Sequence, residues 1–254
     1  MRKALLFLGV LALGLGLAQV RTLDQIRRGG EIRIGTEGEF PPFNYFDERN
    51  QLVGFEIDLG NAIARKLQLR PRWIAQPFDT LLIQLGQGRF DFVIASHGIT
   101  EERARAVDFA NPHYCTGGIL VSRKGGPKTL GDLRGRVVGV QIGTTYMEAA
   151  QRIPGIRQVR TYQRDPDALQ DLLAGRIDTW ITDRFVAKEA IRERRLEGTL
   201  EVGELVFQER VAMAVAKGNR SLLEALNRAL ADLMRDGTYA EISKKWFGED
   251  VRCK

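Results

Sequence analysis

One pattern of apolar and polar positions occurs twice along the chain, at residues 88–96 and at residues 175–183. Each copy follows a run with leucines at helical spacing, begins with Gly, and continues as a short Asp-containing run rich in apolar, β-branched and aromatic residues. Gly commonly ends helices, and an apolar run of this kind predicts a buried strand. The pattern therefore predicts two analogous lobes, with the polar residues Ser96 and Asp183 at the two strand ends. Ligands of open α/β sheets bind outside the carboxyl ends of strands, so we expect both residues in one cleft.

Alternating β-type and α-type periodicity extends through both halves of the chain. Short apolar runs predict strands, and apolar residues three and four positions apart predict helices. The expected strands are residues 31–35, 72–75, 90–95, 119–122, 137–140, 158–162, 178–181 and 211–216, and the expected helices are residues 23–28, 59–67, 80–85, 146–152, 167–173, 185–190, 221–235 and 239–246. This order predicts an α/β fold with mainly parallel sheets and helices on both faces.

The prolines predict a turn and the end of a helix, and the absence of a linker predicts how the two halves are connected. Residues 40–43 place two prolines between phenylalanines, so we expect an exposed turn there rather than a helix or a central strand. Pro71 is expected to end the helix that begins near Leu59. No low-complexity linker separates the two halves, which predicts short strand-like hinges near residues 113–116 and 208–211.

The N-terminal segment has the pattern of a secretory signal peptide. Arg2 and Lys3 precede an apolar run from residue 4 to residue 17, and small residues precede a signal-peptidase position after Ala18. The run is shorter than the roughly 20 apolar residues of a membrane-spanning helix. We therefore expect residues 1–18 to be removed, leaving a soluble, exported protein. No Cys stands at the cleavage site to carry a lipid anchor.

Charge and cysteine content argue against several classes of protein. The formal net charge is +6, or +4 without Arg2 and Lys3, since no acid precedes residue 18, and both signs are interspersed. This predicts a solvated surface and no nucleic-acid partner. Cys115 and Cys253 match no metal-binding pattern, and with only two His in the chain no metal site is expected. In an oxidising compartment the two cysteines could form a disulfide, although sequence alone does not give their separation.

Signatures of catalysis are scarce. Ser96 and His97 are adjacent, so their side chains point apart at a strand end, which does not suit a nucleophile and its base. The Gly-containing segment 139–145 lacks the Lys of a phosphate-binding loop, and the chain has no G-x-G-x-x-G motif. The sequence favours a binding protein over an enzyme and implies no cofactor. His97 is expected to pack or to face solvent rather than to bind.

Several polar positions suit the two ends of a zwitterion. Residues 96–103 predict a strand end, a Gly loop, a Thr cap and Arg103 in the first helical turn. A helix N-terminus offers free N–H groups and a guanidinium adds a forked donor, so a carboxylate fits there. Residues 143–145 offer a second cap, and Asp183 could accept hydrogen bonds from an ammonium group. On the residues alone, a solvated Arg103 and an Asp183 that only caps the following helix both remain open.

Several spaced motifs resemble the polar amino-acid solute-binding proteins of ABC importers, the extracellular solute-binding proteins of family 3. They are GTEGEFPPF (35–43), GFEIDL (54–59), ITEER (99–103) with DF (108–109), GVQIGTT (139–145), and DGTY (236–239) with KWFG (245–248). The resemblance covers nearly the whole mature chain and implies a two-lobed periplasmic-binding-protein fold of type II, with two strand hinges and the ligand in the cleft between the lobes. Lobe 1 would comprise residues 19–114 and 210–254, with the last helices packed on it, and lobe 2 residues 115–209.

Position by position, the resemblance implies that Arg103 clamps the α-carboxylate of a ligand and that Asp183 accepts from its α-ammonium group. The other contacts to the ligand backbone are expected at Ser96, Gly98, Thr144 and Thr145. Relatives often carry Ser, Thr or Asp where this chain has Gly98, so no side chain contributes there.

The resemblance also concerns the side chain of the ligand. Phe40 and Phe78 match an aromatic pair that sandwiches it, with ordinary core packing as the alternative. Glu37 matches an acid found in binders of basic amino acids, and also in glutamine and cystine binders. A carboxylate between aromatic faces suits a cation, because the rings add a cation–π attraction of roughly 0.5–2 kcal/mol. Gln141 also matches the residue that arginine binders carry at the corresponding position. Arginine, lysine or ornithine is therefore expected, with glutamine or another polar amino acid as the alternative.

The expected function is that of a monomeric periplasmic protein that captures an L-amino acid and delivers it to an inner-membrane ABC permease. Two other classes remain open. An exported dehydratase of prephenate-like acids would need an acid or base near its substrate, for which Glu37 is the obvious candidate. The sensory domain of a receptor would have to act through a partner, because the chain has no second membrane segment.

Overall fold

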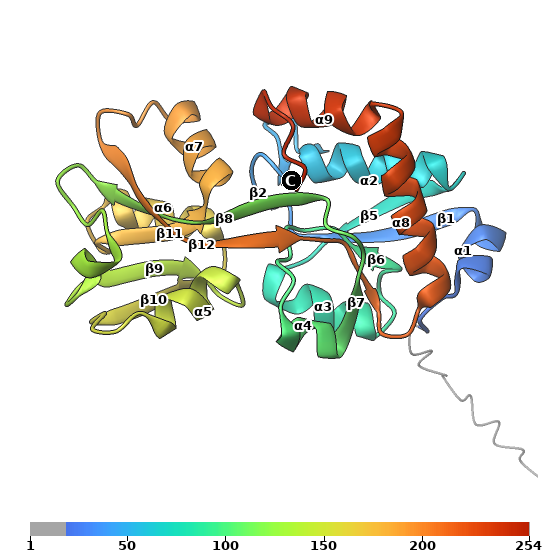
Figure 1. Cartoon of the computed structure of the whole chain (residues 1–254), viewed down its shortest axis with the longest axis horizontal. Coiled ribbons are helices and arrows are strands. Elements are labelled where there is room, and N and C mark those ends of the chain that lie inside the picture. The colour runs from blue at the N-terminus through green and yellow to red at the C-terminus, as the bar shows by residue number, and fades with distance from the viewer. Residues whose placement is uncertain (1–18, 254) are drawn as a thin grey trace, which may run out of the picture.

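The computed structural model describes residues 19–253, whose strands form two five-stranded sheets and one small three-stranded sheet. The expected signal peptide, residues 1–18 with cleavage after Ala18, lies outside the described residues. The two large sheets belong to two lobes, which are connected by the long strands β8 (Tyr114–Arg123) and β12 (Leu200–Val211) (Figure 1). Within residues 19–253, no helix has the length and apolar character needed to span a membrane.

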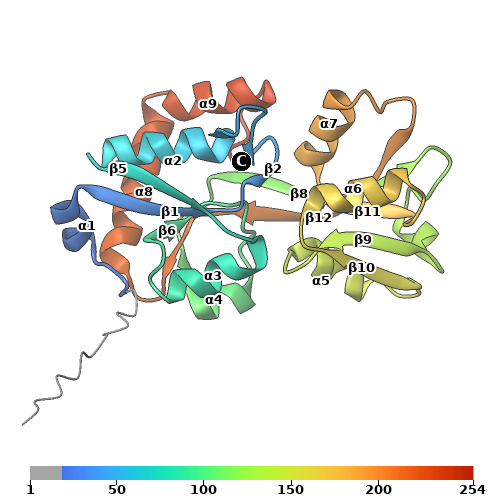
Figure 2. The ribbon, with the colours of Figure 1, turned by 180° about the vertical axis from the view of Figure 1, so that it is seen from behind.

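The sheet of the first lobe combines parallel and antiparallel pairs. Its strand order is β5 (Arg70–Ala75), β1 (Glu31–Thr36), β6 (Phe92–Val93), β13 (Ala214–Ala216) and β7 (Val107–Phe109). Strand β1 is parallel to β5 and β6, whereas β13 is antiparallel to β6 and β7. Five helices lie on its two sides (Figures 1 and 2): α2 (Phe55–Lys66), α8 (Arg220–Arg235) and α9 (Thr238–Phe247) on one, and α3 (Phe78–Gly86) and α4 (Glu101–Ala106) on the other. Helix α1 (Leu23–Gly29) precedes β1.

The second lobe repeats this mixture. Its strand order is β10 (Gln158–Tyr162), β9 (Val137–Gln141), β11 (Thr179–Asp183), β8 and β12, with helices α5 (Thr145–Arg152), α6 (Asp165–Leu173) and α7 (Arg184–Glu193) and a 3₁₀ turn at Leu130–Leu133. Strands β10, β9 and β11 are parallel, and β8 is antiparallel to both β11 and β12. The expectation of mainly parallel sheets is therefore only half correct. Every antiparallel pair in these two sheets includes β8 or β13, which lie in or directly after the strands that connect the lobes, and periodicity along the chain does not give the direction of pairing.

The proline turn is buried rather than exposed, which corrects the expectation for residues 40–43. It joins β2 (Glu39–Phe40) to β3 (Asn44–Phe46), and β4 (Leu52–Val53) completes the small sheet. Pro42 and Phe43 are buried, and the Phe43 ring stacks on Tyr114 with centroids 4.7 Å apart. The prolines hold aromatic rings inward, where their burial stabilises the junction of the lobes.

Helix α2 ends earlier than expected, and Pro71 does not end it. The helix stops at Lys66, and Gln68 adopts a left-handed conformation with φ 59°. Pro71 lies inside β5, which is an edge strand of its sheet. An edge strand tolerates Pro because one side of it needs no hydrogen-bond donors.

The repeated sequence pattern forms the same junction in both lobes. Gly88 and Gly175 follow α3 and α6 in left-handed conformations, with φ of 75° and 74°. The N–H of Asp91 donates to the Arg33 carbonyl (2.9 Å), and its carboxylate accepts from the Arg33 N–H (2.6 Å). Asp178 makes the corresponding pair of bonds to Val137, at 2.8 and 2.7 Å. In each lobe this Asp therefore joins the strand it precedes to the neighbouring parallel strand.

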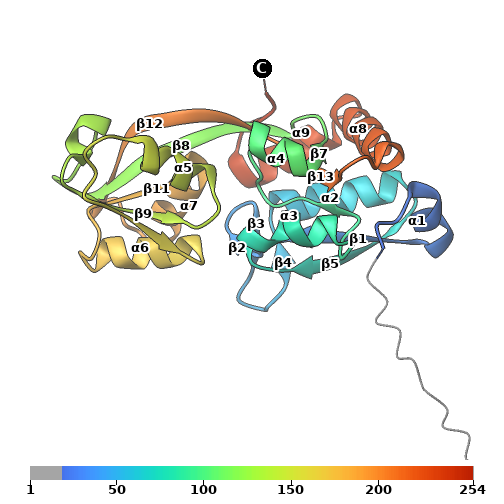
Figure 3. The ribbon, with the colours of Figure 1, turned by 90° about the horizontal axis from the view of Figure 1, so that it is seen from below.

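The lobes are joined by an antiparallel ribbon of β8 and β12, seen edge-on along one side of the molecule in Figure 3. A disulfide joins Cys115 at the start of β8 to Cys253, with Cα atoms 4.9 Å apart, and the Cys115 N–H donates to the Val251 carbonyl. The C-terminal tail is thereby held at the point where β8 leaves the first lobe. We retain residues 19–114 plus 210–254 and residues 115–209 as the proposed extents of the lobes.

Candidate functional site

Most of the predicted site residues line one pocket between the lobes. Its walls include Glu37, Phe40, Phe78, Ser96, Arg103, Gln141, Thr144 and Thr145, together with Tyr146, which the sequence analysis did not single out. The pocket retains a cavity volume of about 10 Å³. The walls must therefore separate before a molecule the size of an amino acid can enter.

The Ser96 turn of the first lobe is fixed by a buried carboxylate. Ser96 adopts a left-handed φ of 54°, and both its N–H and its hydroxyl donate to Glu56, at 2.8 and 3.0 Å. The Glu56 carboxylate is fully buried, accepts from Asn44 Nδ2 (2.7 Å), and lies 2.9 Å from His113 Nε2. Glu56 thus connects the site loop to the small sheet and to the start of the hinge. In the sequence, Glu56 stands in the GFEIDL motif (54–59), but no role was expected for it.

Arg103 reaches across the cleft. The Thr100 hydroxyl caps its helix by accepting from the Arg103 N–H at 3.2 Å. The guanidinium donates to the carbonyls of Gly98 in the first lobe and Gly143 in the second, both at 2.8 Å. Burial lowers the pKa of Arg103 from its ordinary value, while the Glu209 carboxylate opposes this shift. Arg103 is therefore a half-buried cation at the site, and the alternative of a merely solvated charge is wrong.

His97 packs, as expected. It is 2 % exposed and stacks on the Phe78 ring with centroids 4.3 Å apart. Burial, together with the charge of Arg103, lowers the pKa of His97 well below its ordinary value, so the ring is neutral. The Arg103 guanidinium carbon lies 5.7 Å from the Phe78 centroid. His97 supports one aromatic wall of the pocket.

The second lobe contributes the turn between β9 and α5. Gly143 adopts a left-handed φ of 73°, and Thr144 caps α5 by accepting from the Met147 N–H at 3.1 Å while donating to the Gln141 carbonyl at 2.7 Å. The Thr144 hydroxyl is therefore already used by the fold. The first N–H groups of α5 have no partners within the helix, so this wall offers donors to an anion.

Glu37 and Gln141 meet from opposite lobes. Gln141 Nε2 donates to Glu37 Oε1, and Glu37 is 7 % exposed. Burial raises the pKa of Glu37 to about 8, with a smaller contribution from the charge of Asp165. The carboxyl group is consequently mostly protonated at neutral pH, and a cation placed beside it would favour its ionised form.

Asp183 caps helix α7, as one of its two interpretations from the sequence expected. Its Oδ1 accepts from the N–H groups of Phe185 (2.6 Å) and Val186 (3.4 Å), and its Oδ2 accepts from the Thr116 hydroxyl (2.6 Å). The side chain is fully buried, and burial raises its pKa to about 6. Asp183 and Gly98 are not among the residues that line the pocket.

Glu209, which no sequence pattern indicated, brings another carboxylate beside this pocket, although it is not among the residues that line the pocket. It extends from β12, and its Oε2 accepts from the Thr145 hydroxyl at 2.9 Å. Burial raises its pKa to about 7, and the charge of Asp183 adds to the rise. Within residues 19–253, no group of three or more His, Cys, Asp or Glu side chains is arranged to hold a metal ion.

A two-lobed α/β fold whose lobes are connected by two long strands, with a pocket lined by polar and aromatic residues between them, is typical of solute-binding proteins. The chain belongs to the bacterial extracellular solute-binding proteins, family 3, whose model matches residues 32–249.

The names of two similar proteins state the ligand that each of them binds. The chain is 35% identical to the L-cystine-binding protein TcyJ of Escherichia coli K12 over 98% of its own length and 97% of that protein. It is 34% identical to the L-arginine-binding protein of Pseudomonas aeruginosa PAO1, with 98% of each covered.

Two solved structures are also similar. An ancestral arginine-binding protein bound to arginine has a TM-score of 0.83 and 40% identity, covering 86% of this chain and 99% of its own. The ancestral amino acid-binding protein AncCDT-1, a precursor of cyclohexadienyl dehydratase, has a TM-score of 0.83 and 32% identity, covering 89% and 99%. These relatives are binding proteins, and AncCDT-1 is related to an enzyme by its descent.

Proposed function

We propose that this protein binds an L-amino acid with a basic side chain, arginine, lysine or ornithine, in the pocket between its lobes. The observation that carries the proposal is one pocket lined by both the Arg103 guanidinium and the Glu37 carboxyl group. Among the described residues, these two side chains form no ion pair with each other within 4.0 Å. The Arg103 guanidinium therefore remains available for an anionic group of a ligand, and the Glu37 carboxyl group for a cation that would favour its ionised form.

A basic amino acid supplies groups that match the polar side chains of the site. Its α-carboxylate would pair with Arg103 and with the N–H groups at the start of α5, and its α-ammonium group would reach Asp183. The cationic end would pair with Glu37 beside Gln141. The rings of Phe40 and Phe78, which line the same pocket, would add cation–π attraction.

The contacts between the walls suggest how binding is transmitted. Arg103 bonds to Gly143, and Gln141 bonds to Glu37, so both lobes contribute to each end of the pocket. A ligand held by both lobes favours the arrangement in which they lie together. We propose that an ABC permease recognises this arrangement, and that the protein acts in the periplasm after export.

A neutral polar amino acid is the second candidate, for one specific reason. Since the pKa of Glu37 is raised to about 8, its carboxyl group is largely protonated at neutral pH and can donate to an uncharged amide or carboxyl oxygen. Glutamine presents an amide oxygen of this kind, and the distal end of cystine presents a carboxylate oxygen that can accept the same bond. The similarity to a cystine-binding protein supports keeping this class.

Calorimetry tests the proposal. The protein would be unfolded, dialysed, refolded with its disulfide intact, and titrated with L-arginine, L-lysine, L-ornithine, L-glutamine and L-cystine. We expect one basic amino acid to bind tightest, with one molecule per chain. Tightest binding of glutamine or cystine would favour the second candidate. Absence of binding by any of them would reject the function, and a turnover assay with prephenate would then test the dehydratase alternative.

A further inference from the structure

The space beside Gly98 is occupied by a carboxylate from another part of the chain. A Cβ atom built on Gly98 would overlap Oε2 of Glu209 and lie 3.0 Å from its Cδ. Such an approach to Cδ is tighter than ordinary contacts, and the overlap with Oε2 is sterically forbidden. A side chain at position 98 and the Glu209 carboxylate therefore exclude each other in this arrangement.

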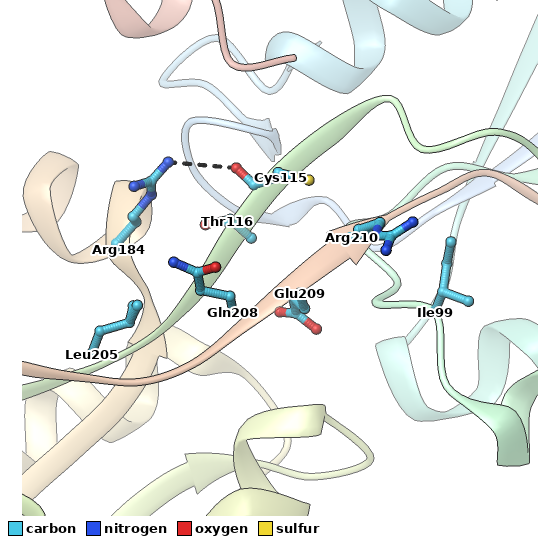
Figure 4. Close-up of a pocket in the computed structure, with 8 residues that line it drawn as sticks. All are labelled: Ile99, Cys115, Thr116, Arg184, Leu205, Gln208, Glu209 and Arg210. Carbon is cyan, nitrogen blue, oxygen red and sulfur yellow. Dashed lines mark hydrogen bonds between the residues drawn. The ribbon is translucent and has the colours of Figure 1, made fainter. Parts of the chain in front are cut away.

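The backbone of β12 fixes this arrangement. The Ile99 N–H donates to the Arg210 carbonyl at 2.9 Å, and the Ala212 N–H donates to the His97 carbonyl at 3.1 Å. These bonds set the register of β12 against the loop that carries Gly98. Figure 4 shows Gln208 and Glu209 on opposite sides of β12, as alternation along a strand requires. The Thr145 hydroxyl then holds the Glu209 carboxylate from the second lobe.

Glu209 and Asp183 are brought to the same side of the hinge ribbon. Glu209 is paired with Thr116 across the antiparallel strands β12 and β8, and directly opposed side chains lie on one face with Cβ atoms about 5 Å apart. The Thr116 hydroxyl donates to Asp183 Oδ2 at 2.6 Å. The negative charge of Asp183 also raises the pKa of Glu209. Two carboxylates that repel each other are stabilised in their ionised forms by a cation placed between them.

We propose that Glu209 is a specificity-determining residue for the amino end of the ligand. It accepts a hydrogen bond from the α-ammonium group beside Asp183, in the space that a side chain at position 98 would otherwise take. An ammonium group has three donors, so two carboxylates and a carbonyl satisfy it. This inference rests on the proposed amino-acid binding and deepens it, since it makes a primary α-ammonium group a requirement for tight binding.

The first test compares ligands with and without that group. Glu209→Gln keeps the side-chain shape and an oxygen that can accept from Thr145, but it removes the charge. The probes are L-arginine and its deaminated analogue 5-guanidinopentanoate, or L-glutamine and 4-carbamoylbutanoate if glutamine binds more tightly. The variant is expected to lose about 10- to 100-fold in affinity for the L-amino acid, the range of a hydrogen bond to a charged group. Affinity for the deaminated analogue should change by less than about 3-fold, since that analogue makes no such bond.

Equal changes for both probes, or no change for either, would overturn the inference while leaving the proposed function intact. Failure of the wild-type protein to bind any amino acid would overturn both. A role of Glu209 in holding the fold alone would lower the affinities for both probes together, so the ratio between them separates the two roles.

The second test exchanges the two side chains. Gly98→Ser should weaken L-arginine binding at least about 10-fold, because its Cβ meets the Glu209 carboxylate. In the double variant Gly98→Ser with Glu209→Ala, the serine hydroxyl can take the vacated space and accept from the ammonium group. The double variant should therefore bind more tightly than Glu209→Ala alone. If the fold-losses in L-arginine affinity of the two single variants simply multiply in the double variant, the two side chains do not substitute for each other and the inference is contradicted. Circular dichroism and thermal unfolding of all variants verify that each is folded.

Discussion

The two lobes are built from the same helix–turn–strand unit but end it differently. In the first lobe the unit ends in the left-handed Ser96, whose N–H and hydroxyl are held by Glu56. In the second lobe it ends in Asp183, whose own carboxylate caps the next helix and accepts from Thr116. The shared framework sets the backbone. The difference at the strand ends gives one wall a turn that leads to the Arg103 cation and the other wall a buried acid.

The Asp shared by the two units also differs in its surroundings. The Asp91 carboxylate is fully buried and pairs with Arg21 and with Arg33, the latter at 3.0 Å. The Asp178 carboxylate is 29% exposed and lies 3.8 Å from Arg136. We therefore expect loss of this Asp to destabilise the protein more in the first lobe than in the second.

The largest expected effect is the loss of binding when either wall loses its charge. Arg103→Ala and Asp183→Asn should each weaken binding of the tightest amino acid by at least about 100-fold, since each removes a charge-assisted bond to one end of a zwitterion. Asn is itself a good N-cap, so Asp183→Asn keeps the cap, whereas Asp183→Ala should also cost about 1 kcal/mol of stability. Calorimetry measures the affinities and thermal unfolding measures the stabilities. Full binding by both charge-removing variants would refute the assignment.

The next largest effect is the difference in protein stability lost when each of the two equivalent acids, Asp91 and Asp178, is replaced. Asp91→Ala should destabilise the protein by about 3 kcal/mol, because two partly buried arginines lose their partner, and Asp178→Ala by about 1 kcal/mol. Urea unfolding of the two variants in parallel gives the comparison. Equal shifts of the midpoint would show that burial does not distinguish the lobes in this way.

The pH dependence of binding should distinguish basic from neutral ligands. The pKa of Glu37 is raised to about 8, and a bound cation would lower it, so a basic ligand releases a proton on binding. Affinity for arginine should therefore rise by roughly 50-fold between pH 6 and pH 8 and level off above about pH 9, relative to glutamine. Titration of Asp183 and Glu209 should change the affinities for arginine and glutamine equally, so it cancels in the ratio of the two affinities.

Glu37→Gln is the matched control for this effect, since it keeps the hydrogen-bonding shape and removes the titrating group. Calorimetry across the pH range should show no difference in slope between the two ligands in this variant. A steeper rise for arginine that persists in Glu37→Gln would assign the proton to another group.

The smallest expected effect concerns the aromatic wall. Phe40→Leu keeps an apolar side chain but removes the ring, so arginine should bind about 3- to 10-fold more weakly while glutamine changes little. Both affinities come from the same titrations. Equal losses for the two ligands would indicate that Phe40 acts only by packing.

Local patterns predicted much of the fold and of the site. Helices and strands whose periodicity is complete within one segment were found, and the motif residues from Glu37 to Thr145 largely meet in one pocket. Features that depend on distant partners were missed. Strand β12 begins at Leu200, and register shifts between Val202 and Phe207 break its alternation. The burial of Phe43 depends on Tyr114 and on the last helix.

The two missed acids have the same explanation. Glu56 gains its role from Ser96 and His113, and Glu209 gains its role from Gly98 and Thr145. Neither set of neighbours is near in sequence. Packing within the first lobe brings Glu56 to its partners, and packing of the two lobes brings Glu209 next to Gly98.

A crystal structure of the protein with the tightest-binding amino acid of the panel would be the most direct measurement. We predict that the α-carboxylate lies within hydrogen-bond distance of the Arg103 guanidinium, and that the α-ammonium group lies within the same distance of Asp183. A ligand bound in the pocket with these two ends reversed, or bound outside it, would contradict the account.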